Sequence, residues 1–125
     1  MSNVLLIDDD HEIRFGLNRV LGRCGHSVIE AESGEDGLKQ LDTHPIDLVF
    51  CDIQFPTGMS GQDTLDAIIQ SYPDVKVVMM SCAMDYNVRE QMEEKGASEC
   101  VQKPFFKEQC ISIINTLIPN GQEAA

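Results

Sequence analysis

The stretch that decides the fold runs from residue 46 to residue 52 and reads Ile46-Asp47-Leu48-Val49-Phe50-Cys51-Asp52. Its apolar run predicts a short strand that is buried on both faces, as in parallel sheets. Residues 53–61 follow with a proline and two glycines, which indicate a loop rather than a continued strand. Because ligands of parallel α/β sheets bind outside the carboxyl ends of the strands, we expect Asp52 to lie in a binding site at that edge of the sheet.

The composition predicts one soluble domain with an acidic surface. The chain has 125 residues, and 42% of them are hydrophobic, which suffices for a substantial core. The 21 acidic and 9 basic residues give a net charge of −12. Such a surface repels phosphate backbones and anionic lipids, so we expect the domain to bind neither nucleic acid nor membrane.

The cysteines and the N-terminus favour a reduced, cytoplasmic protein. The cysteines lie in apolar contexts without a CxxC pair, at positions 24, 51, 82, 100 and 110. The histidines are scattered, so we expect mostly buried thiols and neither a zinc site nor a disulfide framework. No stretch has the length of a membrane-spanning helix, and the N-terminus lacks a signal-peptide pattern.

The rest of the chain alternates between two periodicities. Apolar runs predict further strands at residues 4–7, 26–31, 75–80 and 98–102. Helical spacing predicts helices between the cap Asp10 and Gly25, between the cap Ser33 and His44, and at residues 65–72, 86–95 and 106–117. Five strands that alternate with five helices favour a flavodoxin-like, doubly wound parallel α/β sheet of order 2-1-3-4-5.

This strand order brings three carboxylates together. The first strand delivers Asp8 and Asp9 to its carboxyl end, and the third strand delivers Asp52 beside them. The three charges repel one another and raise each other's pKa, which a hard divalent cation relieves. Mg²⁺ suits a site that offers a few carboxylates, a backbone carbonyl, waters and a phosphate.

The outer strands add two further groups to this edge. Ser81 follows the fourth strand and offers a hydroxyl, and Lys103 follows the fifth strand and offers a cation on a long stem. A metal ion, a hydroxyl and a lysine around a carboxylate can neutralise the oxygens of a phosphoryl group in transfer. The sequence therefore predicts a phosphoryl-binding site.

On these residues the chain resembles the receiver domain of two-component response regulators, over residues 3–118. The matching positions are Asp8 and Asp9, Asp52, Ser81, and the run Lys103-Pro104-Phe105. The resemblance implies a receiver domain at residues 1–119, followed at 120–125 by a frayed tail or the start of a linker.

The resemblance also implies roles for the site residues. Asp52 is the phosphoacceptor, Lys103 pairs with the phosphoryl oxygens, and Ser81 moves toward them. Mg²⁺ is held by Asp9, Asp52 and the main-chain carbonyl of Gln54, with Asp8 acting mostly through a water. The family's cis peptide makes Lys103–Pro104 a candidate for the same geometry.

The partners implied are a sensor histidine kinase or a histidine phosphotransfer protein as donor, and an output domain or protein downstream. A dimer that forms on phosphorylation is compatible with this reading. The resemblance also implies a phosphoacceptor that promotes its own phosphoryl transfer and slow autodephosphorylation, rather than an enzyme.

The chain departs from the family pattern at three places. Phe55-Pro56 replaces the usual Met-Pro, the loop from Pro56 to Gly61 is one residue longer, and Cys100 stands where an aromatic residue is usual. The longer loop is expected to alter partner contacts, and Cys100 to alter how the signal is read out.

Three other readings compete with this one. A degenerate receiver that binds partners without phosphorylation is supported only by Cys100. A phosphohydrolase with an aspartyl nucleophile needs an acid two residues after Asp52, where this chain has Gln54. A flavodoxin-like cofactor carrier needs a Ser/Thr/Gly-rich loop after the first strand, where this chain has residues 8–10, all aspartates.

Overall fold

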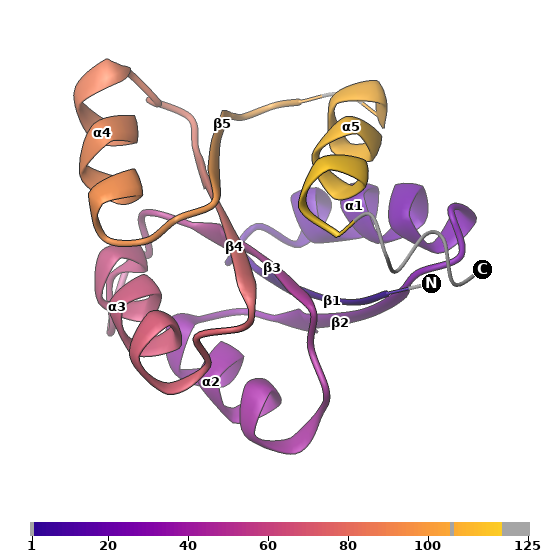
Figure 1. The fold of residues 1–125 in the computed structure, drawn as a ribbon, viewed down its shortest axis with the longest axis horizontal. Coiled ribbons are helices and arrows are strands. Elements are labelled where there is room, and N and C mark those ends of the chain that lie inside the picture. The colour runs from indigo at the N-terminus through magenta and orange to yellow at the C-terminus, as the bar shows by residue number, and fades with distance from the viewer. Residues whose placement is uncertain (1, 106, 119–125) are drawn as a thin grey trace.

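The computed structural model describes residues 2–105 and 107–118, which form one parallel sheet flanked by helices (Figure 1). The sheet has the order β2-β1-β3-β4-β5. Its strands are β1 (Asn3–Ile7), β2 (Ser27–Ala31), β3 (Leu48–Asp52), β4 (Lys76–Ser81) and β5 (Glu99–Gln102). All four neighbouring pairs are parallel, so the five carboxyl ends lie along one edge. The predicted fold class and strand order are confirmed.

The helices cover both faces of the sheet. They are α1 (His11–Arg23), α2 (Gly34–Thr43), α3 (Gly61–Ser71), α4 (Tyr86–Glu94) and α5 (Lys107–Leu117). In Figure 1, α1 and α5 lie on one side of the sheet, and α2, α3 and α4 lie on the other. The predicted start of the last helix, Phe106, and the tail after Pro119 lie outside the described residues.

Local signals set the helix ends. The carboxylate of Asp10 accepts hydrogen bonds from the N–H groups of Glu12 and Ile13, so the predicted cap of α1 is confirmed. Ser33 caps α2 in the same way, as predicted. The chain turns after α1 at Gly25, with φ of 89°, and after α4 at Gly96, with φ of 111°, both in the left-handed region that favours glycine.

The sheet has a hydrophobic core on each face, because alternate residues of a strand point to opposite faces. In β1, Val4 and Leu6 join the core under α1 and α5, while Leu5 and Ile7 join the core under α2, α3 and α4. Every residue of β3 is buried, as the apolar run predicts for a central strand. The central strand therefore carries Asp52 to the edge on a rigid support.

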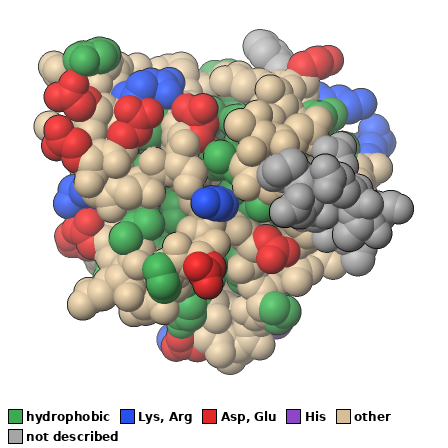
Figure 2. Space-filling view, in the orientation of Figure 1, with side chains coloured by type: hydrophobic (Ala, Val, Ile, Leu, Met, Phe, Trp, Pro, Cys, Tyr) green, Lys and Arg blue, Asp and Glu red, His purple; other side chains and the backbone are tan. Residues whose placement is uncertain are grey.

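The exposure of the cysteines agrees in part with the expectation that most of them are buried. The free cysteines Cys51, Cys100 and Cys110 are buried, whereas Cys24 at the end of α1 and Cys82 after β4 are exposed. Acidic side chains gather on the side of the molecule that α3 and α4 form (Figure 2). Within the described residues, no helix is long and apolar enough to cross a membrane.

Candidate functional site

The edge of the sheet brings one buried lysine between two buried carboxylates. Asp8 directly follows β1, and Asp52 ends β3. The Lys103 Nζ lies 2.9 Å from Asp8 Oδ2 and 3.2 Å from Asp52 Oδ2. The side chains of Lys103, Asp8 and Asp52 are 6%, 1% and 10% exposed, so these contacts are shielded from water.

A third carboxylate completes the cluster. Oxygen atoms of Asp8, Asp9 and Asp52 all lie within 4.8 Å of one another, and Asp9 is exposed to solvent. Three carboxylates against one lysine leave the cluster with excess negative charge. Hard oxygen donors that converge at this spacing match the donor set that divalent cations such as Mg²⁺ prefer.

The environment shifts the pKa of both central groups. Burial raises the pKa of Asp52, the charge of Asp8 raises it further, and Lys103 opposes both. Burial alone would lower the pKa of Lys103, but its contacts with Asp8 and Asp52 outweigh burial and raise the pKa. Lys103 is therefore a permanent cation, and Asp52 is a carboxylate whose charge is not fully compensated.

Backbone features keep Asp52 and Lys103 in place. The Lys103–Pro104 peptide is cis, as the resemblance predicts. The Lys103 N–H donates to the Ser81 carbonyl over 2.8 Å, which extends the β4–β5 pairing to the site. The Gly61 N–H donates to Ile53 O over 2.8 Å, and a Cβ at Gly61 would overlap the Asp52 carbonyl. Only glycine fits at residue 61 without moving the backbone of Asp52.

The longer loop after β3 is hydrogen-bonded to a side chain of α2. Gly58 adopts a φ of 76°, and the next N–H, that of Met59, donates to the Glu35 carboxylate over 2.9 Å. The hydrogen bond to Met59 lowers the pKa of Glu35.

Closer to the site, the Gln54 N–H donates to Asp52 Oδ1 over 3.3 Å. The predicted role of the Gln54 carbonyl as a metal ligand stays a prediction.

Ser81 ends β4 and supports the turn that follows it. Its Oγ accepts a hydrogen bond from the Ala83 N–H over 3.0 Å. The Gln102 side chain, on β5, forms two hydrogen bonds with the same turn. Its Oε1 accepts from the Met84 N–H over 3.0 Å, and its Nε2 donates to the Cys82 carbonyl. Sequence reasoning missed Gln102, whose only signal is that it precedes Lys103.

Arg14 is the second residue near the site that sequence reasoning missed. It lies on the inner face of α1, and its side chain is 8% exposed. Its Nη1 donates to the main-chain carbonyl of Asp8 over 2.6 Å, and its Nε donates to Glu30 Oε1 over 2.9 Å. An arginine on the apolar stripe of a helix is the only sequence signal for this contact.

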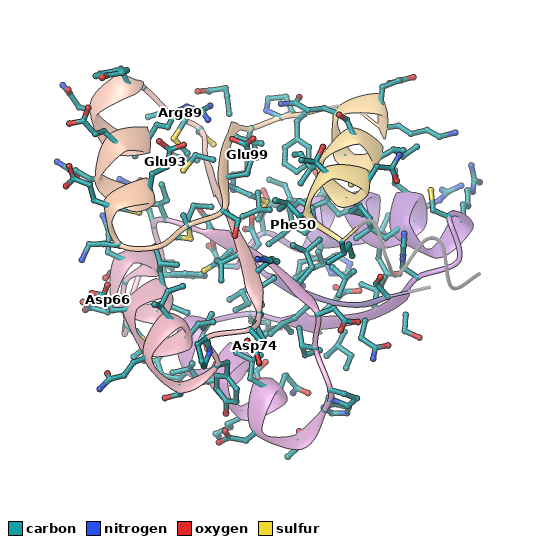
Figure 3. All side chains as sticks on the ribbon, viewed as in Figure 1. Phe50, Asp66, Asp74, Arg89, Glu93 and Glu99 are labelled. Atoms are coloured by element: carbon teal, nitrogen blue, oxygen red, sulfur yellow. The ribbon has the colours of Figure 1, made fainter. Side chains whose placement is uncertain are left out.

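Cys100 lies near the start of β5, next to Glu99, which forms an ion pair with Arg89 of α4. Figure 3 labels Arg89 and Glu99. Arg89 Nη1 lies 2.8 Å from Glu99 Oε1, and the same oxygen accepts from the Cys100 N–H over 2.9 Å. Burial raises the pKa of the Cys100 thiol to about 11, so it stays protonated at neutral pH. A cavity of about 360 Å³ with Arg89, Cys100 and Ile113 in its wall adjoins the thiol.

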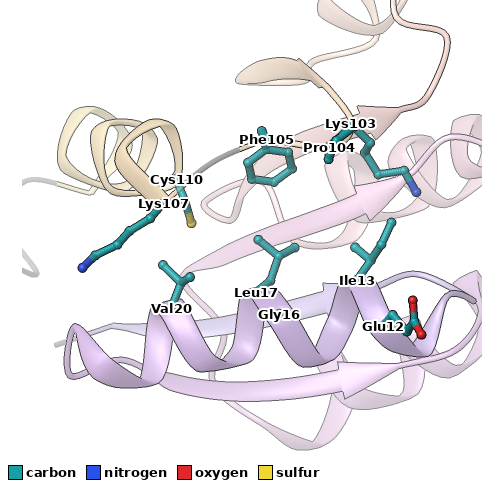
Figure 4. A pocket seen from close by; sticks show the side chains of 10 residues that line it. All are labelled: Glu12, Ile13, Gly16, Leu17, Val20, Lys103, Pro104, Phe105, Lys107 and Cys110. Carbon is teal, nitrogen blue, oxygen red and sulfur yellow. The ribbon is translucent and has the colours of Figure 1, made fainter.

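A largely apolar cavity of about 320 Å³ lies beside the site, between α1 and α5 (Figure 4). Ile13, Leu17 and Phe105 line it, with Lys103 at one end and Lys107 at the other. None of the three clustered carboxylates lines it. The cavity is therefore a surface next to the polar site and not the polar site itself.

Comparison with known proteins agrees with this arrangement. The model of the response regulator receiver domain family matches residues 4–115. The DNA-binding transcriptional regulator NtrC of Klebsiella pneumoniae is 32% identical over 118 residues, which are 94% of this chain and 25% of NtrC. The response regulator UvrY of Escherichia coli strain K12 is 31% identical over 119 residues, which are 94% of this chain and 54% of UvrY.

A solved structure shows the same architecture. The receiver domain of NtrX from Brucella abortus superposes with a TM-score of 0.88 and is 26% identical, covering 93% of this chain and 98% of that domain. The chain thus spans about a quarter of NtrC and about half of UvrY, but nearly the whole of an isolated receiver domain.

Proposed function

This chain belongs to the response regulator receiver domain family, and from that membership we propose that it accepts a phosphoryl group on Asp52 from a phosphohistidine donor. One observation carries the proposal. The Lys103 amine contacts both Asp8 and Asp52 at a sheet edge where three carboxylates converge. Such a site presents a nucleophilic oxygen, a fixed cation and a divalent-cation donor set together.

Mg²⁺ is the cofactor we propose for the transfer. Asp9, Asp52 and the main-chain carbonyl of Gln54 would hold the ion, with Asp8 reached through a water. Supporting this assignment, the cluster has uncompensated negative charge and its oxygens lie within 4.8 Å of one another. When bound, the ion neutralises negative charge on the phosphoryl oxygens.

The protein's own groups have separate tasks in the transfer. An Asp52 oxygen forms the new bond to phosphorus, while the bond from phosphorus to the donor imidazole breaks and its electron pair stays on the imidazole nitrogen. Lys103 is within reach of the Asp52 carboxylate and would contact the oxygens of the arriving phosphoryl group. Ser81 would donate its hydroxyl hydrogen to the same oxygens, since its Oγ already accepts from Ala83.

We propose a sensor histidine kinase or a histidine phosphotransfer protein as the donor. The apolar cavity beside Lys103, between α1 and α5, offers a contact surface within reach of the site. Because NtrC and UvrY are longer than this chain, the output is proposed to reside in a further domain or a separate protein. The degenerate-receiver reading is less well supported, because Asp8, Asp9, Asp52 and Lys103 converge as transfer requires.

The experiment is incubation with acetyl phosphate, followed by intact mass measurement. The proposal predicts the gain of one phosphoryl group that depends on Mg²⁺ and is absent in Asp52→Asn. Asp63→Asn, at an exposed position on α3, is the matched control and should be labelled as the parent protein is. Undiminished labelling of Asp52→Asn would refute the proposal.

A further inference from the structure

Arg14 is buried deeply for an arginine, and within the described residues its side chain contacts the Asp8 carbonyl and the carboxylates of Glu30 and Glu32, on the β1–β2 side of the site. Its side chain is 8% exposed, which requires that its charge be paired. The Nε donates to Glu30 Oε1 over 2.9 Å, and the other Glu30 oxygen accepts from Asn18 Nδ2 over 2.7 Å. The remaining strong contact is the 2.6 Å hydrogen bond from Nη1 to the Asp8 carbonyl.

The Asp8 carbonyl belongs to the peptide that joins the first two carboxylates of the cluster. The pairing of β1 with both neighbouring strands ends at Ile7. Beyond that residue, the backbone hydrogen bond that joins Asp8 to the described part of the sheet is the one from its N–H to the Ala31 carbonyl, over 3.1 Å. The carbonyl of the Asp8–Asp9 peptide is therefore held by Arg14 and not by the strand ladder.

The Asp8 side chain is fixed separately. Its Oδ1 accepts from the Asp10 N–H over 2.9 Å, and its Oδ2 accepts from Lys103 over 2.9 Å. With the carbonyl held by Arg14, every polar group of Asp8 has a partner. Asp9 is exposed, and its carboxylate has no hydrogen-bond or ion-pair partner within the described residues, so its own side-chain contacts do not hold it in place.

We propose that Arg14 is a positioning residue for the divalent cation, because it fixes the peptide that sets Asp9 relative to Asp8 and Asp52. This inference rests on the proposed function. The contribution is geometric rather than electrostatic, since Glu30 compensates the charge of Arg14 at 2.9 Å. Partners that orient metal ligands typically change metal affinity by about 10- to 100-fold when they are removed.

The test is the Mg²⁺ affinity of the unphosphorylated protein, measured from amide chemical shifts during a Mg²⁺ titration. Arg14→Met should weaken binding by about tenfold. Its rate of phosphorylation by acetyl phosphate at saturating Mg²⁺ should stay near that of the parent. Arg19→Met is the matched control, because it removes the same charge from an exposed position of α1, and it should keep the parent affinity. Equal affinities of the two variants would overturn the inference.

Two more variants separate geometry from charge. Arg14→Lys keeps the charge but lacks the fork that reaches Glu30 and the Asp8 carbonyl together, so it should bind Mg²⁺ as weakly as Arg14→Met. Glu30→Gln keeps an acceptor oxygen and loses the charge, so it should bind Mg²⁺ nearly as the parent does. Full affinity of Arg14→Lys, or a tenfold loss in Glu30→Gln, would contradict a geometric role.

Folding and the proposed function are controlled independently. If Arg14→Met does not fold, Arg14→Lys decides the outcome, together with hydrogen exchange of the Asp10 amide in metal-free protein. That amide is bonded to Asp8 and should exchange faster in the variant, while amides of β4 keep the parent rate. Asp9→Asn and Asp52→Asn test the metal site itself. If they bind Mg²⁺ as the parent does, the proposed function fails. If they lose affinity but the Arg14 variants do not, only this inference fails.

Discussion

Removal of the Lys103 charge should destabilise the metal-free protein by an amount that the site geometry sets. At an effective dielectric constant of about 20, charges 2.9 Å and 3.2 Å apart attract by about 5 to 6 kcal/mol each. Desolvation of the three groups offsets most of this attraction in the intact protein. The cost appears when Lys103→Met leaves the carboxylates of Asp8 and Asp52 buried without a cation beside them.

Repulsion between these two carboxylates gives the scale of the loss. Oxygens 4.8 Å apart, the upper limit of their separation here, repel by about 3.5 kcal/mol under the same dielectric assumption. Removal of one partner from a buried ion pair usually costs about 3 to 5 kcal/mol. We therefore expect Lys103→Met to lose about 3 kcal/mol of unfolding free energy, and Asp52→Asn in that background to recover about 2 kcal/mol.

Urea unfolding followed by circular dichroism measures these differences. A loss of about 3 kcal/mol lowers the midpoint by roughly 1.5 M urea for a domain of this size. Lys95→Met is the matched control, because the Lys95–Asp66 pair lies at the surface with side chains 37% and 50% exposed, and it should cost less than about 1 kcal/mol. Added Mg²⁺ should restore most of the stability of Lys103→Met. Equal losses in the two lysine variants, or no recovery on adding Asp52→Asn, would show that Lys103 does not stabilise the protein by compensating these two carboxylates.

Three further predictions concern Asp52, Ser81 and Cys100. Burial and a neighbouring carboxylate raise the pKa of Asp52, so the stability it contributes is present below its unfolded pKa and lost as the pH rises through the raised value. Metal-free Asp52→Asn should therefore unfold at higher urea than the parent at neutral pH, with the difference vanishing in acid. Lys103→Ala should weaken binding of beryllofluoride, a phosphoryl mimic, because Lys103 compensates its charge. Ser81→Ala should still bind beryllofluoride but lose much of the amide-shift response away from the site. Equal losses of beryllofluoride affinity in the two variants would count against these separate roles. Because residue 100 is a cysteine, the amide-shift changes on beryllofluoride binding should concentrate at residues 82–88. Cys100→Tyr should enlarge the changes near α5, since a ring can make contacts that differ between two states. Equally strong changes around Cys100 in the parent protein would show the idea to be wrong.

The sequence was informative wherever one local pattern decides the structure. Uninterrupted apolar runs predicted the strands, and the strand order then placed Asp8 beside Asp52 without knowledge of any side-chain contact. The Asp10 and Ser33 caps were also predictable, because a cap depends on residues two or three positions away. The β4 strand includes Ser81, one residue beyond the predicted end, because the pairing of Ser81 with Gln102 continues the ladder.

Contacts between distant segments were not predictable in the same way. Arg14 meets the Asp8 carbonyl only after α1 packs on the sheet, and a helical pattern does not say which backbone group an inward arginine meets. Gln102 meets the turn after β4 because two strands end side by side. The longer loop was visible in the sequence, but not that Glu35 holds it through Met59. Cys82 is exposed because it lies in a turn, although its context is apolar.

The most direct test of the central claim locates the phosphoryl group within the chain. Protein treated with acetyl phosphate and Mg²⁺ is reduced with borohydride, which converts an acyl phosphate to the corresponding alcohol, and is then digested and mapped by tandem mass spectrometry. We predict that residue 52 alone carries the reduced side chain, and that labelling requires Mg²⁺. Reduction at Asp8 or Asp9, or no reduced residue in protein that had gained phosphoryl mass, would contradict it.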